Sequence, residues 1–263
     1  MKYKIIAIDV DGTLVDDNGD MPLENIEALR NAYDKGVIVT LCTGRPIQAA
    51  QPIMDSIGLD MPFITYNGAM VVSAKTHDIL FEQSMSLEDV LRVYKLGKEY
   101  DTTMIVWSRN RLYVNRMDER SISYGKQAQT EPELVTDINK LAIEGVTKIL
   151  WYDEVDIING FVKTVGNHVG EGVNFHTSKP FFLEFVDVKS SKGLALEKLG
   201  EHLGVERDSI IAIGDGYNDL SMIEYAGMGI AMENAPDDIK EKADFVTLSN
   251  NENGVAYAVN KFI

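Results

Sequence analysis

The chain has 263 residues, enough to bury a sizeable core in one large domain or two domains of moderate size. Its formal net charge of −16 opposes binding to nucleic acid or to an anionic membrane, because both attract proteins first through phosphate neutralisation. No apolar run is long enough to span a membrane or to form the core of a signal peptide. We therefore expect a globular cytoplasmic protein with neither partner.

The first fifty residues have the pattern of a β-α-β unit. The short apolar run over residues 5–8 predicts a buried strand, which ends in the turn-forming pair Asp11-Gly12. Apolar residues at helical spacing predict a helix from Pro22 to Gly36, followed by a strand over 37–41. Cys42 is the only cysteine, and we interpret it as a buried structural thiol.

The middle of the chain follows a different pattern. It predicts a helix over residues 87–100, a stretch with poor signals after about residue 115, and a helix near 155–169. The expected strands cover residues 104–107, 112–114, 146–152, 173–176 and 181–186. Because this is an α+β pattern, we predict an inserted domain over residues 83–189, within a domain formed by residues 1–82 and 190–263.

Alternating strands and helices return after Lys192. We expect helices up to Leu203 and over 220–225, and strands over 210–213, 228–231 and 245–248. Such alternation predicts an α/β fold, in which helices cover both faces of a parallel sheet.

The first of four motifs, Asp9-Val10-Asp11-Gly12-Thr13, directly follows the first predicted strand. Ligands of open parallel sheets bind beyond the carboxyl ends of the strands, so this loop lies where a site is expected. One carboxylate could attack phosphorus while the other transfers a proton. The alternative interpretation is a strand-ending turn with two solvated carboxylates.

The second and third motifs contain groups that suit an anion. In Thr43-Gly44-Arg45 a hydroxyl and backbone amides could bind phosphate oxygens, although the same residues could form a plain turn before a helix. Ser190-Ser191-Lys192-Gly193 begins a predicted helix. A lysine is not electrostatically favoured at this end of a helix, so its presence suggests a bound anion, with a solvated lysine as the alternative.

The fourth motif, Gly214-Asp215-Gly216-Tyr217-Asn218-Asp219, follows another apolar strand. Two carboxylates and an amide are hard oxygen ligands that suit Mg²⁺. A dinucleotide-binding loop is excluded because Asp219 stands at the place of its third glycine. An Asx-rich turn is the remaining alternative.

Together the four motifs resemble those of the haloacid dehalogenase (HAD) superfamily, and the resemblance covers essentially the whole chain. Three further segments are similar to the Cof-type subgroup and its YidA-like sugar phosphatases: Thr43-Gly44-Arg45-Pro46, Tyr66-Asn67-Gly68-Ala69 and Ile223-Glu224-Tyr225-Ala226-Gly227. The resemblance implies a HAD-like Rossmannoid core with a parallel sheet, into which an α+β cap of the C2B type is inserted.

The resemblance also implies a role for each motif residue. Asp9 would be nucleophile and Mg²⁺ ligand, Asp11 general acid/base and metal ligand through its backbone carbonyl, and Asp215 the remaining metal ligand. The phosphate or substrate contacts would be Val10, Thr43, Gly44, Arg45, Lys192 and Asn218, supported by Asp219.

We therefore expect a Mg²⁺-dependent phosphatase that hydrolyses small phosphorylated metabolites, sugar phosphates above all, through an aspartyl-phosphate on Asp9. A phosphomutase would use the same intermediate and is an alternative that the sequence leaves open. A noncatalytic metabolite-binding module is the alternative from another class, but it would need a defective reaction centre, whereas Asp9, Asp11, Lys192 and Asp215 are all present.

Overall fold

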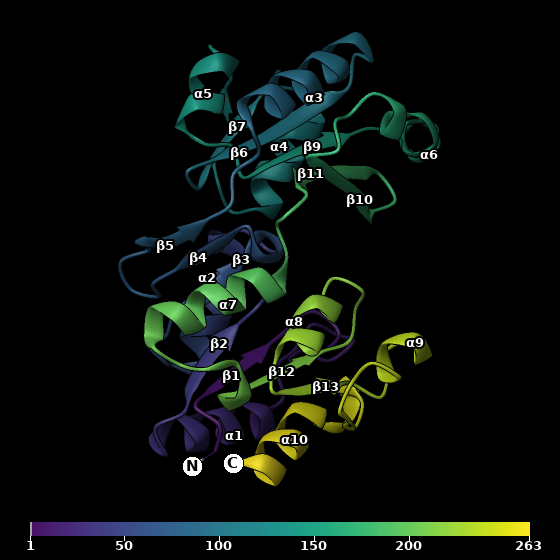
Figure 1. Cartoon of the computed structure of the whole chain (residues 1–263). Coiled ribbons are helices and arrows are strands. Elements are labelled where there is room, and N and C mark those ends of the chain that lie inside the picture. The colour runs from purple at the N-terminus through teal and green to yellow at the C-terminus, as the bar shows by residue number, and fades with distance from the viewer. Residues whose placement is uncertain (1) are drawn as a thin grey trace. The chain divides into compact units, whose positions relative to one another are not determined.

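The computed structural model describes residues 2–263 and divides into two compact units (Figure 1). The first unit contains the chain up to Arg45 together with Ala50–Phe81 and Ser191–Ile263. The second unit contains Glu82–Ser190, and the short segment Pro46–Ala49 groups with it. Within residues 2–263, no helix combines the length and the apolar character needed to cross a bilayer.

A five-stranded parallel sheet forms the centre of the first unit, in the order β14-β13-β12-β1-β2. Its strands are β1 (Ile5–Ile8), β2 (Ile38–Leu41), β12 (Ile210–Gly214), β13 (Met228–Ala231) and β14 (Phe245–Val246). β1 lies between β12 and β2 in a register that places Ile8 opposite both Ile213 and Leu41. The loops that follow these three strands therefore begin side by side.

Helices pack against this sheet because its strands are apolar on both faces. They are α1 (Leu23–Asp34), α2 (Ile47–Ile57), α7 (Lys192–Leu203), α8 (Leu220–Tyr225), α9 (Asp237–Lys240) and α10 (Gly254–Phe262). Ile5 and Ala7 share a core cluster with Leu196 of α7 and Met222 of α8. Figure 1 shows α1 beside α10, and the backbone amide of Ala256 donates to the Asn25 side chain at 2.9 Å.

A small sheet in the order β3-β4-β5, in which β3 and β4 are antiparallel, completes the first unit. Its strands are β3 (Phe63–Thr65), β4 (Met70–Val72) and β5 (Ile79–Glu82), and the single-turn 3₁₀ helix η1 (Tyr66–Gly68) joins the first two. The sequence did not predict these strands, because β3 and β4 have only three residues each. It also did not predict α2, which contains Pro52 in its interior.

The second unit is a six-stranded sheet in the order β10-β11-β9-β6-β7-β8, antiparallel except for the pair β7 and β8. Its strands are β6 (Thr103–Ser108), β7 (Arg111–Val114), β8 (Glu133–Leu134), β9 (Lys148–Tyr152), β10 (Val173–Lys179) and β11 (Phe182–Asp187). Its helices are α3 (Leu87–Glu99), α4 (Glu119–Gln127), α5 (Ile138–Glu144) and α6 (Val155–Thr164).

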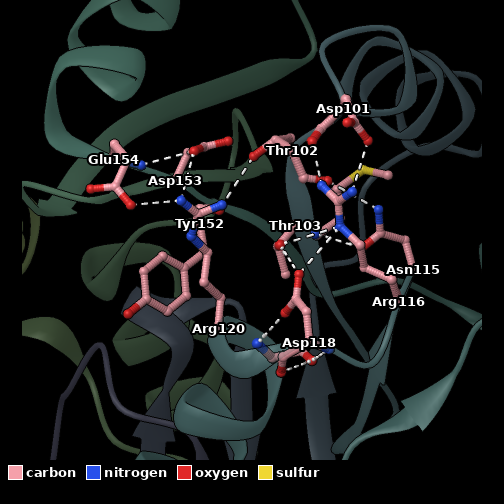
Figure 2. A network of polar contacts seen from close by, with 12 residues as sticks. Asp101, Thr102, Thr103, Asn115, Arg116, Asp118, Arg120, Tyr152, Asp153 and Glu154 are labelled. Carbon is pink, nitrogen blue, oxygen red and sulfur yellow. Dashed lines mark hydrogen bonds and ion pairs between the residues drawn. The ribbon is translucent and has the colours of Figure 1, made fainter.

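Polar contacts hold the start of α4 against the ends of two strands (Figure 2). Asp118 caps the helix by accepting from the Ser121 amide at 2.8 Å, and its other oxygen accepts from the Thr103 hydroxyl at 2.5 Å. Arg120, in the first turn, pairs with Asp153 at 3.1 Å and with Glu154 at 2.8 Å. The cap and the ion pairs thus add to the packing of Tyr124, which is buried against Trp107 and Phe182.

The expected α/β class, with a parallel sheet and an additional α+β unit, is confirmed. Within the α+β unit the sequence missed α4, α5 and β8, because a polar helix, a seven-residue helix and a two-residue strand give weak signals. The helix expected over 155–169 ends at Thr164, where a 3₁₀ turn that contains Gly166 begins. The last expected strand, over 245–248, has only two residues.

Candidate active site

The floor of the candidate site is formed by the carboxyl ends of β1, β2 and β12. The amide of Asp9 donates to the Ile213 carbonyl at 2.9 Å, and the amide of Cys42 donates to the Ile8 carbonyl at 2.7 Å. These bonds continue the parallel ladder by one residue beyond the strands. As a result Asp9 emerges at the centre of the sheet edge with only 4% of its surface exposed. Cys42 is fully buried, as expected.

Lys192 joins two aspartates that are distant in the sequence. Its ammonium nitrogen Nζ lies 2.5 Å from Oδ1 of Asp9 and 2.5 Å from Oδ1 of Asp219. The lysine is the first residue of α7 and is completely buried, while Ser191 caps the helix by accepting from the Leu194 amide at 3.1 Å. When both carboxylates are ionised, the one cation between them leaves a net charge of −1 in a buried region.

Both carboxylate oxygens of Asp219 accept hydrogen bonds. Its second oxygen, Oδ2, accepts from the amide of Asp215 at 3.0 Å and from that of Gly216 at 2.8 Å. Asp219 therefore fixes the loop after β12 through Oδ2 and positions Lys192 through Oδ1.

Burial, and to a smaller extent neighbouring negative charge, raises the pKa values of Asp9 and Asp215. Burial raises the pKa of Asp9 to about 8 even though Lys192 acts against it, and the negative charges of Asp219 and Asp215 add to the rise. Burial also raises the pKa of Asp215 to about 6, although the hydroxyl of Thr13 donates to Oδ1 at 2.9 Å and lowers it. Burial alone would lower the pKa of Lys192, but the carboxylates of Asp9 and Asp219 hold it above its ordinary value.

These acids suit a hard divalent cation. Asp9, Asp215 and Asp219 each place a carboxylate oxygen within 4.8 Å of the others. Oδ2 of Asp219 accepts two amide hydrogen bonds and its Oδ1 accepts from Lys192. Within residues 2–263, by contrast, Oδ2 of Asp215 accepts only the long 3.4 Å contact from Asn234 and Oδ2 of Asp9 accepts no hydrogen bond, so these two oxygens are the most open to a metal. A cation would favour the ionised form of both carboxyls, whose pKa values burial and neighbouring negative charge raise.

Asp11 lies outside this buried group and pairs with Arg45. The guanidinium donates from Nε to Oδ2 at 2.9 Å and from Nη2 to Oδ1 at 2.5 Å, which is a two-pronged contact. Side-chain exposure is 61% for Asp11 and 34% for Arg45, so the carboxylate can exchange protons with solvent. The sequence expected Arg45 to contact phosphate or substrate, whereas here it contacts the predicted acid/base.

The loop after β2 offers unused hydrogen-bond donors. Thr43 is buried, and its hydroxyl oxygen accepts from the Arg45 amide at 3.1 Å. The Gly44 amide donates to no acceptor within the described chain, so it is available to an anion. A Cβ at Gly44 would lie 2.8 Å from Oδ1 of Asn67, so this backbone can carry no side chain without displacing its neighbour.

Of the two remaining predicted phosphate or substrate contacts, Val10 is buried and Asn218 is exposed. The Val10 side chain is fully buried and its carbonyl accepts from the amides of Leu14 and Val15 at 3.0 and 3.1 Å, so only its amide could face a ligand. Asn218 is exposed, and its Nδ2 donates to Oδ1 of Asn67 at 3.1 Å.

Two asparagines at the site received no role from the sequence. Asn67 accepts from Asn218, and Asn234 donates to the Gly12 carbonyl at 2.9 Å and to Oδ2 of Asp215 at 3.4 Å. Asn234 comes three residues after β13, so the expectation that ligand-binding groups follow parallel strands could have identified it.

The sequence and the fold of this chain are similar to those of known proteins. The sequence profile of the haloacid dehalogenase-like hydrolases matches residues 6–259. The Bacillus subtilis protein YxeH is 35% identical, over 99% of this chain and 98% of its own. The 5-amino-6-(5-phospho-D-ribitylamino)uracil phosphatase YwtE, also from Bacillus subtilis, is 32% identical, with coverage of 99% and 98%. The crystal structure of TM0651 from Thermotoga maritima superposes with a TM-score of 0.87 at 26% identity, covering 99% of this chain and 98% of that one.

Proposed function

The chain belongs to the haloacid dehalogenase-like hydrolases and is a phosphoric monoester hydrolase of that superfamily, and from this premise we propose that it hydrolyses small phosphorylated metabolites through an aspartyl-phosphate on Asp9. Sugar phosphates are the proposed substrate class and Mg²⁺ the proposed cofactor.

The observation that carries the proposal is the contact of Lys192 with Asp9 at the edge of the parallel sheet. A buried lysine that binds one oxygen of Asp9 leaves the other oxygen without a hydrogen bond from the described chain. One carboxylate oxygen of Asp9 is the nucleophile of the proposed reaction, while Oδ2, to which no described residue donates, would face the metal. The amide of Gly44, the hydroxyl of Thr43 and Lys192 supply donors for the phosphate oxygens.

The reaction has two steps that use the same groups. In the first, a carboxylate oxygen of Asp9 bonds to phosphorus, the ester P–O bond breaks, and Asp11 gives a proton to the departing oxygen. In the second, Asp11 takes a proton from water, the water oxygen bonds to phosphorus, and the bond to Asp9 breaks to release phosphate. Because Asp11 holds Arg45 through both oxygens, it must give up at least one of these bonds to act.

Asp9 and Asp215 would hold Mg²⁺, together with the backbone carbonyl of Asp11 proposed from the family resemblance. When bound, the metal supplies positive charge that reduces the repulsion between Asp9 and the anionic phosphate. Lys192 alone leaves a net negative charge among its two aspartates, which is why we propose that the chain needs a second cation.

Three observations support the substrate class. YwtE is named for a phosphorylated ribityl compound, which is small and sugar-derived. The proposed donors, which are the Gly44 amide, the Thr43 hydroxyl and Lys192, would all bind the phosphate group that different esters share, so the site could accept several esters. The net charge of −16 disfavours polyanions as substrates.

We further propose that residues 83–189 form the inserted cap of this family. The cytoplasmic location stays a prediction.

The test is kcat/KM across sugar phosphates, nucleotides, cofactor phosphates and phosphopeptides, with Mg²⁺ and with chelator. Release of inorganic phosphate from sugar phosphates, abolished by Asp9→Asn, supports the proposal. Positional isomers without phosphate release would indicate a mutase. A preference for phosphopeptides would overturn the substrate class, and full activity in chelator would overturn the metal.

A further inference from the structure

The loop Tyr66–Gly68 has an unusual backbone. Tyr66, Asn67 and Gly68 have φ values of 52°, 55° and 93°, so three consecutive residues lie in the left-handed region. Glycine and asparagine tolerate this region, but an aromatic residue rarely adopts it, and each strained residue costs on the order of 1 kcal/mol or more. Such a conformation persists only where surrounding contacts fix it.

Backbone contacts attach this loop to two of the motifs. The amide of Asn67 donates to the Thr43 carbonyl at 3.0 Å, and that of Tyr66 donates to the Arg45 carbonyl at 3.2 Å. Gly68 packs against the backbone between Ser191 and Lys192 so closely that no side chain would fit. The strained loop therefore connects the backbone that carries Thr43 to the start of the helix that carries Lys192.

The Asn67 side chain extends these contacts to a third motif. Its Oδ1 accepts from Nδ2 of Asn218 at 3.1 Å. The same amide group lies against Gly44, with Nδ2 only 3.1 Å from the place of a Cβ there. Within residues 2–263, Nδ2 of Asn67 donates to no acceptor, and neither does the neighbouring Gly44 amide.

We propose that Asn67 is a further phosphate-binding residue, whose Oδ1 orients Asn218 while its Nδ2 donates to a phosphate oxygen beside the Gly44 amide. The ligand class is a phosphate monoester or inorganic phosphate, so the inference rests on the proposed function. A neutral donor suits this place, because it binds an anion without altering the charge balance of Lys192 with its two aspartates.

Two substitutions separate the side chain from the backbone. Asn67→Gly keeps a residue that tolerates positive φ but removes the amide, and Asn67→Asp keeps the shape but replaces the donor with a negative charge. For Asn67→Gly we expect KM for a sugar phosphate and the inhibition constant of inorganic phosphate to rise together by about 10- to 100-fold, the range for one hydrogen bond to a charged partner. Asn67→Asp should lose more, because its carboxylate repels the phosphate.

Asn253 is the matched control, since it has φ 59° and lies at the start of α10 outside the site. Asn253→Gly and Asn253→Asp should leave both constants unchanged. Wild-type values in Asn67→Gly would overturn the inference even if the enzyme proves to be a phosphatase.

Calorimetric titration with inorganic phosphate and Mg²⁺ separates this inference from the proposed function. Weaker phosphate binding by Asn67→Gly supports the site even if no ester is hydrolysed, whereas a wild-type protein that binds no phosphate overturns both. If Asn67→Gly does not fold, the affinity of Asn67→Asp for inorganic phosphate is the test instead. An affinity equal to that of the wild type would contradict the proposal.

Discussion

Replacing Lys192 with methionine should remove most of the activity and also change how stability depends on pH. The lysine makes two hydrogen bonds of 2.5 Å, one to Asp9 and one to Asp219, and is completely buried. In the proposed reaction Lys192 also donates to a phosphate oxygen, and one hydrogen bond to a charged group contributes about 1.5–3 kcal/mol. At about 1.4 kcal/mol per tenfold, the loss of that bond should lower kcat/KM by roughly one to two orders of magnitude.

The same substitution leaves Asp9 and Asp219 buried without their cation. Removing one partner of a buried ion pair costs about 3–5 kcal/mol of unfolding free energy. The pKa of Asp9, which Lys192 now holds down, should rise further above its value in the unfolded chain. Folding then takes up protons, so the penalty is absent at low pH and grows as the pH rises through the unfolded values. Lys192→Met should therefore be closer to wild type in stability at pH 5 than at pH 8.

The assays are kcat/KM with a small phosphate ester and Mg²⁺, and urea denaturation at both pH values. Lys198→Met is the matched control, because Lys198 lies on the same helix but its side chain is 37% exposed and, among residues 2–263, pairs only with Glu201. It should behave like wild type in both assays. Activity of Lys192→Met within about threefold of wild type would refute the reasoning, since that corresponds to less than about 1 kcal/mol.

Two further predictions concern the metal and the strained loop. Mg²⁺ should raise the melting temperature more at pH 8 than at pH 6, because burial raises the pKa of Asp9 to about 8 and that of Asp215 to about 6, and metal competes with protons for both. Both carboxyl pKa values are raised in the folded state, so metal-free protein should lose stability as the pH rises, and a Mg²⁺ effect that shrinks with pH would contradict this. Gly68→Ala should destabilise by several kcal/mol more than Gly36→Ala in urea denaturation, because both have positive φ but only Gly68 lies against backbone that an added Cβ would strike. Equal losses of unfolding free energy in the two variants would contradict the predicted clash at Gly68.

The sequence predicted the central sheet because its strands are buried on both faces. Residues such as Ile5–Ile8 and Ile210–Ile213 form continuous apolar runs that stand out from the helices between them. The small sheet was not predictable in this way, because β3 and β4 have three residues each. The helix α4 was missed for a different reason, since most of its nine residues are polar and its contacts with Asp153 and Phe182 come from distant parts of the sequence.

The site could be anticipated only as far as strand ends and motif spacing allow. Parallel strands predict that Asp9 and Asp215 lie near each other, since their loops leave the same edge of the sheet. The pairing of Asp11 with Arg45, 34 residues away, and of Asn67 with Asn218, 151 residues away, depends on side-chain directions that only the folded chain defines. Those pairings decide which donors remain free for a ligand.

The measurement that tests the central claim most directly is the identification of a phosphoryl group on Asp9. Asp11→Asn should still let Asp9 attack phosphorus but slow the attack of water on the intermediate, so the phosphoenzyme should accumulate. After acid quenching during turnover, mass spectrometry should find one phosphoryl group on the peptide that contains Asp9, and none in the Asp9→Asn variant. Steady turnover without a phosphorylated peptide, or turnover that survives Asp9→Asn, would contradict the account.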